Sequence, residues 1–378
     1  MEKLPVELLE NIFHELSSLR DIQNAFNTCS KWRNIIKSMF KDKAKILIVS
    51  RSPSDYLEIE LIDLIEPKLN FKFEVEGRAS IKGAVGGFIQ NKPMICGGLN
   101  KCREVQNCLV LGENYIFSLI TDRFEASSIV LKQRECLWVT GGRTIFGNQF
   151  CNANGLSSTE FVTSNPPNTV QGPKLPFTIF GHTMVQVDSK LILIIGGCQN
   201  GEVSNKTWFV DLSNDFEIKE GPPLIFARAG HSCSRMRMNG KLFIVVTSPK
   251  VWSSSSDHFG KITTSSIGEH VEILDSTALG QGWMIGPSFP INVSGYTMIS
   301  SPNKKSILLI GIEALRGSIM LMEMSGDSQT NLKWTIVDEG LKDSRIGPYS
   351  TVNFWSDVAF PISSQGFQFD ELRKKFLN

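Results

Sequence analysis

One short pattern recurs through most of this chain: four or five apolar residues that are often followed by two adjacent glycines. The clearest copies end at Gly98, Gly142 and Gly197, which places them 44 and 55 residues apart. Weaker copies lie at 45–50, 241–248 and 306–311. Spacing of this kind is typical of a repeated β-sheet unit that buries its apolar strand against neighbouring copies. The pattern therefore predicts an all-β repeat architecture over most of the chain.

A second pattern keeps the same phase as the first. Gly-Pro pairs begin at Gly172 and Gly221, and Gly-His pairs begin at Gly181 and Gly230, so both pairs recur after 49 residues. Glycine suits the turn that leaves a crowded strand, because it tolerates positive φ angles and close backbone approach. Two patterns in phase indicate repeated sheets of one design.

The order of these features resembles the kelch repeat, and the copy from Gly196 to His231, with Arg228 before the Gly-His pair, is close to it. The resemblance covers about residues 45–355 and implies a β-propeller. Counting apolar strands near 48, 95, 139, 194, 245 and 309 gives six blades, with seven as the alternative. The first blade lacks its innermost strand, and we expect the run at 349–355 to supply it and close the ring.

Residues 4–40 have a different period, because apolar residues recur there at steps of three and four, as on one face of a helix. Three short helices are expected, with more apolar surface than so small a unit can bury internally. The fold class predicted is therefore all-β, a six-bladed kelch-type β-propeller preceded by a small three-helix segment. We expect the helices at 1–41, the propeller at 45–362, and a tail at 363–378 that could form a short helix.

The helical segment resembles the F-box, which opens with Leu-Pro, continues with Glu-Leu-Leu and an Ile-Phe pair, and ends near Cys-Ser-x-x-Trp. Its middle departs from the family, since Ile22 replaces the usual leucine. The resemblance implies helix-in-groove docking to the Skp adaptor of a cullin-RING ubiquitin ligase. The residues expected to bind the adaptor are Leu4, Pro5, Leu8, Leu9, Ile12 and Phe13. The alternative is a helical cap that packs only on the chain's own sheets.

Composition excludes several classes of function. The 39 basic and 38 acidic residues leave a net charge of +1, which gives no electrostatic signature of nucleic-acid or membrane binding. The longest apolar runs, such as 191–195, are far too short to span a membrane, and the start of the chain lacks signal-peptide features. The eight cysteines show no metal or disulfide spacing. We expect free thiols and a location in the cytoplasm or nucleus.

Catalytic and cofactor motifs are missing from the sequence. His182 and His231 occupy equivalent repeat positions, which favours a structural role for both. No metal-ligand spacing, phosphate-binding loop or nucleophile elbow occurs. We expect no enzyme activity, no cofactor and no metal; an enzyme on a propeller frame, such as a copper oxidase, is the remaining alternative.

Target binding is expected on the loops that follow the paired glycines, because loops carry variable chemistry on a rigid frame. Long loops lie at 143–157, 198–205, 248–267 and 312–318. The anchors expected there, chosen as exposed loop residues, are Arg143, Phe146, Asn148, Gln199, Asn200, Trp252 and Arg316.

These features lead to one hypothesis and one alternative. The chain is expected to be the substrate receptor of an SCF-type ubiquitin ligase, bound to a Skp adaptor and its cullin and capturing an unidentified target protein. The alternative is a kelch-repeat scaffold or cytoskeleton-binding protein without a ubiquitin role.

Overall fold

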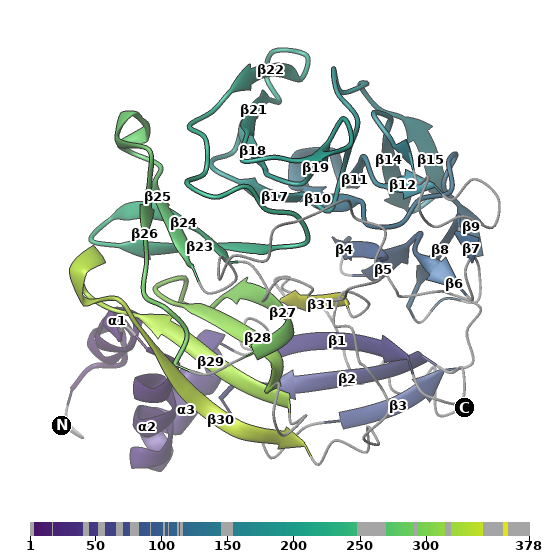
Figure 1. The fold of residues 1–378 in the computed structure, drawn as a ribbon. Helices are drawn as coiled ribbons and strands as arrows, with labels where there is room; N and C mark the ends of the chain where they lie inside the picture. The colour runs from purple at the N-terminus through teal and green to yellow at the C-terminus, as the bar shows by residue number, and fades with distance from the viewer. Residues whose placement is uncertain are drawn as a thin grey trace.

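Three α-helices precede a body made of β-strands (Figure 1). The helices are α1 (Val6–Glu15), α2 (Leu19–Thr28) and α3 (Ser30–Phe40). This computed structural model describes residues 4–16, 18–40, 45–51, 57–65, 71–75, 83–90, 92–100, 103–104, 106–111, 113, 116–144, 154–247, 270–290, 293–301, 303–313, 319–342 and 358–361.

The strands form six four-stranded antiparallel sheets in the described part of the chain, numbered here in chain order. Sheet 1 contains β31 (Val358–Pro361), β1 (Lys45–Arg51), β2 (Leu57–Asp63) and β3 (Phe71–Val75). Sheet 2 contains β4 (Val85–Ile89), β5 (Lys92–Cys96), β8 (Asn107–Val110) and β9 (Ile116–Ser118). Sheet 3 contains β10 (Ser127–Leu131), β11 (Cys136–Thr140), β14 (Thr159–Ser164) and β15 (Pro167–Gln171).

The other three sheets repeat this order of strands. Sheet 4 contains β17 (Thr183–Gln186), β18 (Leu191–Ile195), β21 (Thr207–Asp211) and β22 (Glu217–Glu220). Sheet 5 contains β23 (Ser232–Met238), β24 (Lys241–Thr247), β25 (Glu272–Asp275) and β26 (Trp283–Ile285). Sheet 6 contains β27 (Val293–Ser300), β28 (Ile307–Glu313), β29 (Ile319–Ser325) and β30 (Lys333–Lys342).

Short additional strands join the loops between these sheets. They are β6 (Leu99–Asn100) with β7 (Arg103–Glu104), β12 (Arg143–Thr144) with β13 (Asn154–Gly155), and β16 (Ile179–Phe180) with β19 (Cys198–Gln199) and β20 (Glu202–Val203).

Each apolar run found in the sequence forms the second strand of its sheet: β1, β5, β11, β18, β24 and β28. These strands are flanked by a strand on each side and covered by neighbouring sheets, so they need not alternate between apolar and polar residues. In β18, for example, Ile192, Leu193, Ile194 and Ile195 are all fully buried. The predicted strand positions are confirmed.

The first strand of sheet 1 comes from the far end of the chain. β31 pairs antiparallel with β1, so that Ile48 lies opposite Ala359. The expected donor, residues 349–355, lies outside the described residues. The strand that supplies this position begins at Val358, three residues beyond the expected run.

Neighbouring sheets contact each other through their first strands. β4 contacts β10, β10 contacts β17, β17 contacts β23, and β23 contacts β27. β31 contacts both β27 and β4. Apolar side chains fill the seams between sheets; Leu193 of β18 and Ile244 of β24, for instance, belong to one buried cluster. This side-by-side burial is what allows a repeated unit to share its core with the next copy.

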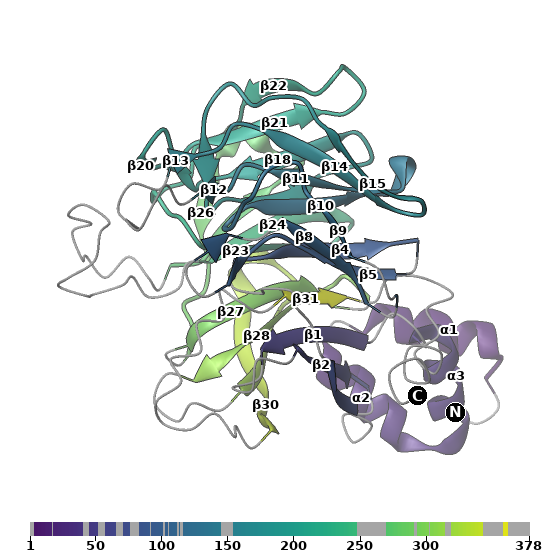
Figure 2. The same ribbon diagram turned by 90° about the vertical axis from the view of Figure 1, so that its right-hand side faces the viewer.

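The three helices pack against sheet 6 and the end of β2, on one side of the sheets (Figure 2). Their cluster includes Ile299, Leu308, Ile310 and Leu321 of sheet 6 and Leu64 after β2. The helical members of the cluster are Leu9, Phe13, Leu19, Ile22, Ala25, Phe26, Ile35, Ile36 and Phe40. The excess apolar surface predicted for the helices is thus partly covered by the sheets.

One expectation about the cysteines is wrong. Cys96 of β5 and Cys108 of β8 form a disulfide between directly opposed residues of neighbouring strands, with 4.1 Å between their Cα atoms. Spacing along the chain gave no sign of this pair, because the strand register brings the two residues together. Among the described residues, Cys29, Cys136, Cys198 and Cys233 are free thiols.

Candidate functional site

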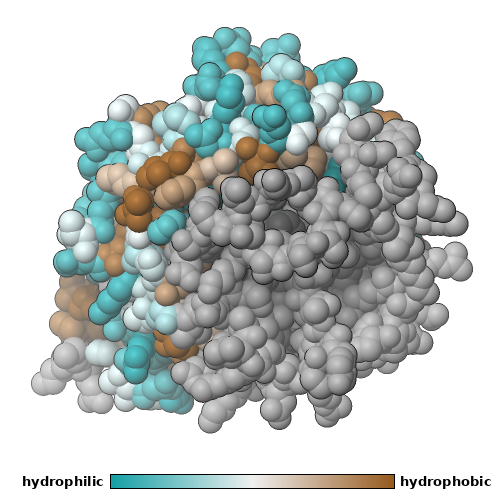
Figure 3. All heavy atoms as spheres, in the orientation of Figure 1, coloured by the Kyte–Doolittle hydropathy of each residue, from teal (hydrophilic) through white to brown (hydrophobic). Residues whose placement is uncertain are grey.

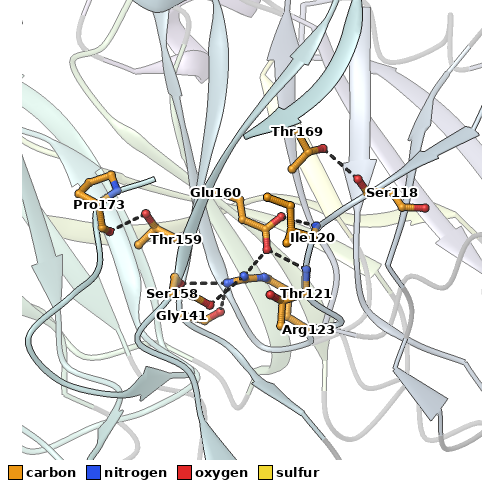
Figure 4. A network of polar contacts seen from close by, with 10 residues as sticks. All are labelled: Ser118, Ile120, Thr121, Arg123, Gly141, Ser158, Thr159, Glu160, Thr169 and Pro173. Atoms are coloured by element: carbon orange, nitrogen blue, oxygen red, sulfur yellow. Dashed lines mark hydrogen bonds and ion pairs between the residues drawn. The ribbon is translucent and has the colours of Figure 1, made fainter. Parts of the chain in front are cut away.

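Buried ion pairs anchor two of the segments that connect one sheet to the next, and Figure 4 shows the first of them. Glu160 of β14 accepts a hydrogen bond from Arg123, and its carboxylate also accepts from the backbone N–H groups of Ile120 at 2.8 Å and Thr121 at 3.1 Å. Arg123 in turn donates to the carbonyl of Gly141 at 2.6 Å. The segment that leads from sheet 2 into sheet 3 is therefore anchored to the third strand of sheet 3.

The same junction is repeated between sheets 4 and 5. Glu272 of β25 accepts from Arg228 and from the backbone N–H groups of Ile225 at 2.7 Å and Phe226 at 3.2 Å. Arg228 was recognised from the sequence as part of a repeat, but its carboxylate partner was not. The glutamate lies 44 positions further along the chain, on a strand whose register the sequence does not give.

The two histidines of the Gly-His pairs are structural, as the repeat phase predicted. Nε2 of His182 lies 2.8 Å from the Thr140 hydroxyl, and Nε2 of His231 lies 2.8 Å from the Thr183 hydroxyl. Burial lowers the pKa of His182 to about 3, so its ring is neutral at physiological pH. The pKa of His231 is also lowered well below its ordinary value, by burial and then by the charge of Arg228. Each ring links one sheet to the preceding one.

The loops that follow the paired glycines lie on the side of the sheets opposite the helices, as the positions of β12, β13 and β20 indicate in Figure 2. Figure 3 views this side: hydrophilic side chains dominate the rim of its described part, and hydrophobic ones form a short band. A mixed surface of this kind is compatible with protein binding.

Three of the predicted target-binding residues lie in the described part of these loops. Arg143 is half-buried, 2.8 Å from Glu125, with its guanidinium over the rings of Phe124 and Phe180 at 4.7 and 4.8 Å. Asn200 is exposed, and its side-chain oxygen accepts from the backbone N–H of Thr178 at 3.1 Å.

Gln199 differs from expectation. It is only 8% exposed, its amide donates to the Gly196 carbonyl at 3.0 Å, and its oxygen accepts from the Trp208 indole at 3.2 Å. It cannot serve as an exposed anchor, because both ends of its amide bind within the fold. Phe146, Asn148, Trp252 and Arg316 lie outside the described residues.

Helix α1 divides the predicted adaptor-binding residues between two faces. Leu9 and Phe13 are fully buried, 0% and 1% exposed, and Phe13 packs edge-on against Trp32. These two side chains lie inside the apolar cluster that holds the three helices together. Leu8 and Ile12, by contrast, are 47% and 43% exposed.

The exposed face of α1 extends toward the start of the helix. Val6, which the sequence interpretation missed, is 44% exposed, and Pro5 at the N-cap is also exposed. Leu4 is half-buried and packs against the helical core. Leu8 and Ile12 lie one turn apart on the same face of α1, whereas Val6 lies about 160° around the helix from Leu8. The exposed face of α1 therefore comprises Pro5, Leu8 and Ile12.

Polar contacts also fasten the helices to sheet 6. The Asn303 amide donates to the Leu16 carbonyl at 2.7 Å, and the Lys305 ammonium lies 2.8 Å from the Glu15 carboxylate. A further contact joins the helices to the end of β2 in sheet 1, where the Gln23 amide donates to the Leu64 carbonyl at 2.7 Å. These contacts and the shared apolar cluster fix the direction in which the exposed face of α1 points.

Comparison with known proteins assigns a class to the helical segment. Residues 1–40 match the family model described as F-box-like. The chain therefore carries an F-box-like domain ahead of a body of antiparallel β-sheets. F-box domains are typically non-enzymatic modules that bind a Skp-type adaptor, which indicates an adaptor role in SCF-type complexes.

The rest of the chain is similar to solved structures in fold alone. A matching solved structure, titled "Structure of YjhT", aligns with a TM-score of 0.58 at 10% sequence identity, over 77% of this chain and 94% of that chain. A search of curated proteins found no match.

The described residues contain no group of three or more side chains suited to holding a metal ion. None of the helices in that part of the chain combines the length and apolar character needed to cross a membrane.

Proposed function

We propose that this chain is the substrate receptor of an SCF-type ubiquitin ligase, with α1 docking a Skp adaptor and the sheets capturing a target protein. The observation that carries the proposal is the exposed aliphatic face of α1 formed by Leu8 and Ile12, within a segment that matches the F-box-like family. Exposed aliphatic residues on one face of a helix suit a hydrophobic groove on a partner. Ubiquitin transfer itself belongs to other subunits, including the cullin and its partners.

We propose that the six sheets are the blades of a closed kelch-type β-propeller over residues 45–362. Three features support this: four strands in each sheet, contacts between the first strands of consecutive sheets, and the pairing of β31 with β1. Pairing of the two ends of the chain would leave no free edge in the innermost layer. The F-box-like segment then comprises residues 1–41 and the tail residues 363–378.

The adaptor contacts proposed are Pro5, Leu8 and Ile12, with Leu4 at the edge of the patch. Leu9 and Phe13 act indirectly, because they set the position of α1 on the other two helices.

Target capture is proposed for the loops that follow the paired glycines. They lie on the opposite side of the sheets from the helices, so an adaptor on α1 would leave them accessible. Arg143 and Asn200 are the described candidates, and Phe146, Asn148, Trp252 and Arg316 remain candidates from the sequence. Arginine and tryptophan are favoured because they often dominate interface energies.

The test is co-purification of the full chain with a purified Skp adaptor. The double variant Leu8→Asp with Ile12→Asp places two charges on the exposed face, and we expect binding to fall by at least about a hundredfold, because unpaired charges in a hydrophobic interface are costly. The matched control is Ile285→Asp in β26, an exposed aliphatic residue (59%) far from the helices, which should bind normally.

Absence of adaptor binding by the unaltered chain would favour the alternative, a kelch-repeat scaffold or cytoskeleton-binding protein without a ubiquitin role. Equal loss of binding in the Ile285→Asp control would mean that α1 is not the docking face.

A further inference from the structure

A pocket of about 360 Å³ opens where the turns between first and second strands meet. Its lining includes four cationic side chains and one acidic one: Lys132, Arg235, Arg237, Lys304 and Asp188. The whole chain carries a net charge of only +1, so this pocket concentrates positive charge in an otherwise balanced molecule. A volume of this size falls in the range of ligand-binding pockets.

The cations come from sheets 3, 5 and 6, and sheet 4 between them contributes Asp188 and neutral residues. Lys132 lies in the short 3₁₀ turn η2 (Lys132–Arg134) between β10 and β11, and Arg235 and Arg237 lie on β23. Lys304 lies in the turn between β27 and β28. Since β10, β17, β23 and β27 contact one another in that order, the charges follow a line across sheets 3 to 6.

Backbone contacts hold the pocket in shape. The Arg237 N–H donates to the Lys304 carbonyl at 2.7 Å, which joins sheet 5 to the turn of sheet 6. The Arg235 guanidinium donates to the carbonyl of Gln186, which joins sheet 5 to sheet 4. The pocket is therefore built from fixed parts of the frame and not from one loop.

Three of the four cations in the pocket, Lys132, Arg235 and Arg237, have no acidic partner among the described residues. Asp188 uses its Oδ1 to accept from the N–H groups of Lys190 and Leu191 at 2.7 and 2.9 Å. Burial lowers the pKa of Arg235, and the neighbouring charge of Arg237 lowers it further. Like charges held close together in a partly buried site favour an anionic ligand that relieves their repulsion.

We propose that this pocket binds an acidic peptide segment of a partner protein. A row of separate cations across several sheets suits several carboxylates on an extended chain better than a single compact anion. The site is distinct from the target-binding loops proposed above, because it lies at the opposite ends of the strands. It also lies near the helices, since Asn303 and Lys305, which flank Lys304, hold the end of α1.

The test is fluorescence anisotropy of a labelled oligoglutamate peptide with the purified full chain, at low and at high salt. We expect binding at low salt that weakens as salt rises. The double variant Lys132→Glu with Arg237→Glu reverses two exposed charges and should weaken binding by at least about tenfold. The matched control, Lys206→Glu with Lys219→Glu, reverses two exposed charges on sheet 4 away from the pocket and should bind as the unaltered chain does.

Three outcomes would overturn the proposal. They are no peptide binding at low salt, equal weakening in the pocket and control variants, and pocket-dependent binding of inorganic phosphate that the peptide does not displace. The assay uses no adaptor, so its result does not depend on whether α1 binds one.

Discussion

The carboxylate of Glu323 in β29 accepts a hydrogen bond at 2.7 Å from the backbone N–H of Leu19, the first residue of α2, although 304 positions separate them. Glu323 is fully buried and also accepts from the Ser306 hydroxyl. A carboxylate at the N-terminus of a helix satisfies an otherwise unpaired donor and complements the helix dipole. This contact makes the attachment of the helices to sheet 6 specific.

Replacing this carboxylate should change how stability depends on pH. Burial raises the pKa of Glu323 above its ordinary value of 4.5, although the hydrogen bonds from Ser306 and Leu19 oppose the shift. The folded protein then holds this proton more tightly than the unfolded chain, so the stabilisation is full below about pH 4.5 and falls as pH rises through the raised pKa. Glu323→Gln should therefore gain stability relative to the unaltered protein as pH rises from that value.

Urea unfolding at a series of pH values measures this difference. Glu220→Gln, which removes a surface carboxylate from β22, serves as the control. A stability difference between Glu323→Gln and the unaltered protein that stays constant from acid to neutral pH would contradict the prediction.

The two faces of α1 should respond differently to truncation. Leu9→Ala or Phe13→Ala leaves a cavity in the helical core and should lower the free energy of unfolding by about 2–5 kcal/mol. Leu8→Ala and Ile12→Ala remove exposed side chains and should change it by less than about 0.5 kcal/mol. Thermal unfolding of the four variants distinguishes these values, and similar losses in all four would place the exposed face in a core.

Gly196, the first of the paired glycines after β18, should not tolerate a side chain, because it lies directly against the His231 ring. Gly196 has φ +55°, and a Cβ there would lie 2.7 Å from the Arg228 carbonyl and 2.9 Å from the His231 ring. We expect Gly196→Ala to lower the free energy of unfolding by well over about 1 kcal/mol, since backbone strain and a steric clash add. Gly201 also has positive φ, at +91°, but no atom lies within 4 Å of its Cβ position, so Gly201→Ala should show the strain alone. If Gly196→Ala and Gly201→Ala lowered the free energy of unfolding equally, the steric clash at Gly196 would contribute nothing.

The buried pair of Arg228 and Glu272 should behave as a coupled unit. Arg228→Met or Glu272→Gln alone leaves a charge in an interior where both side chains are at most 1% exposed, and each should cost about 3–5 kcal/mol. The double variant should cost clearly less than the two single variants together, because no unpaired charge remains. A double-mutant cycle by chemical denaturation measures the coupling, and additive losses would show that the pair is not coupled.

Local pattern predicted much of the fold, since it depends on features close together in the sequence. The apolar runs before Gly98, Gly142 and Gly197 became second strands because burial on both faces is visible as an unbroken apolar run. The strand that pairs with β1 begins at Val358, beyond the run expected to do so, because one isolated strand carries no repeat signal. The pairing of Cys96 with Cys108 was missed, since cross-strand register depends on the folded sheet.

The site was predicted less completely. Helical periodicity grouped Leu8, Leu9, Ile12 and Phe13 as one stripe, but the stripe is wider than one face, and the packing of α2, α3 and sheet 6 decides which members remain exposed. Gln199 was expected on the surface because it follows paired glycines, yet its amide is used within the fold. The cationic pocket escaped notice entirely, because its residues lie far apart in a chain of balanced charge.

The packing of α1–α3 on sheet 6 also sets an order for biosynthesis. These helices leave the ribosome long before the side chains that cover them, Ile299, Leu308, Ile310 and Leu321. A nascent chain must therefore carry its helices without this support until sheet 6 has been made. A prematurely terminated product would lack the platform that orients α1, so interrupted translation should yield chains that recruit the adaptor poorly.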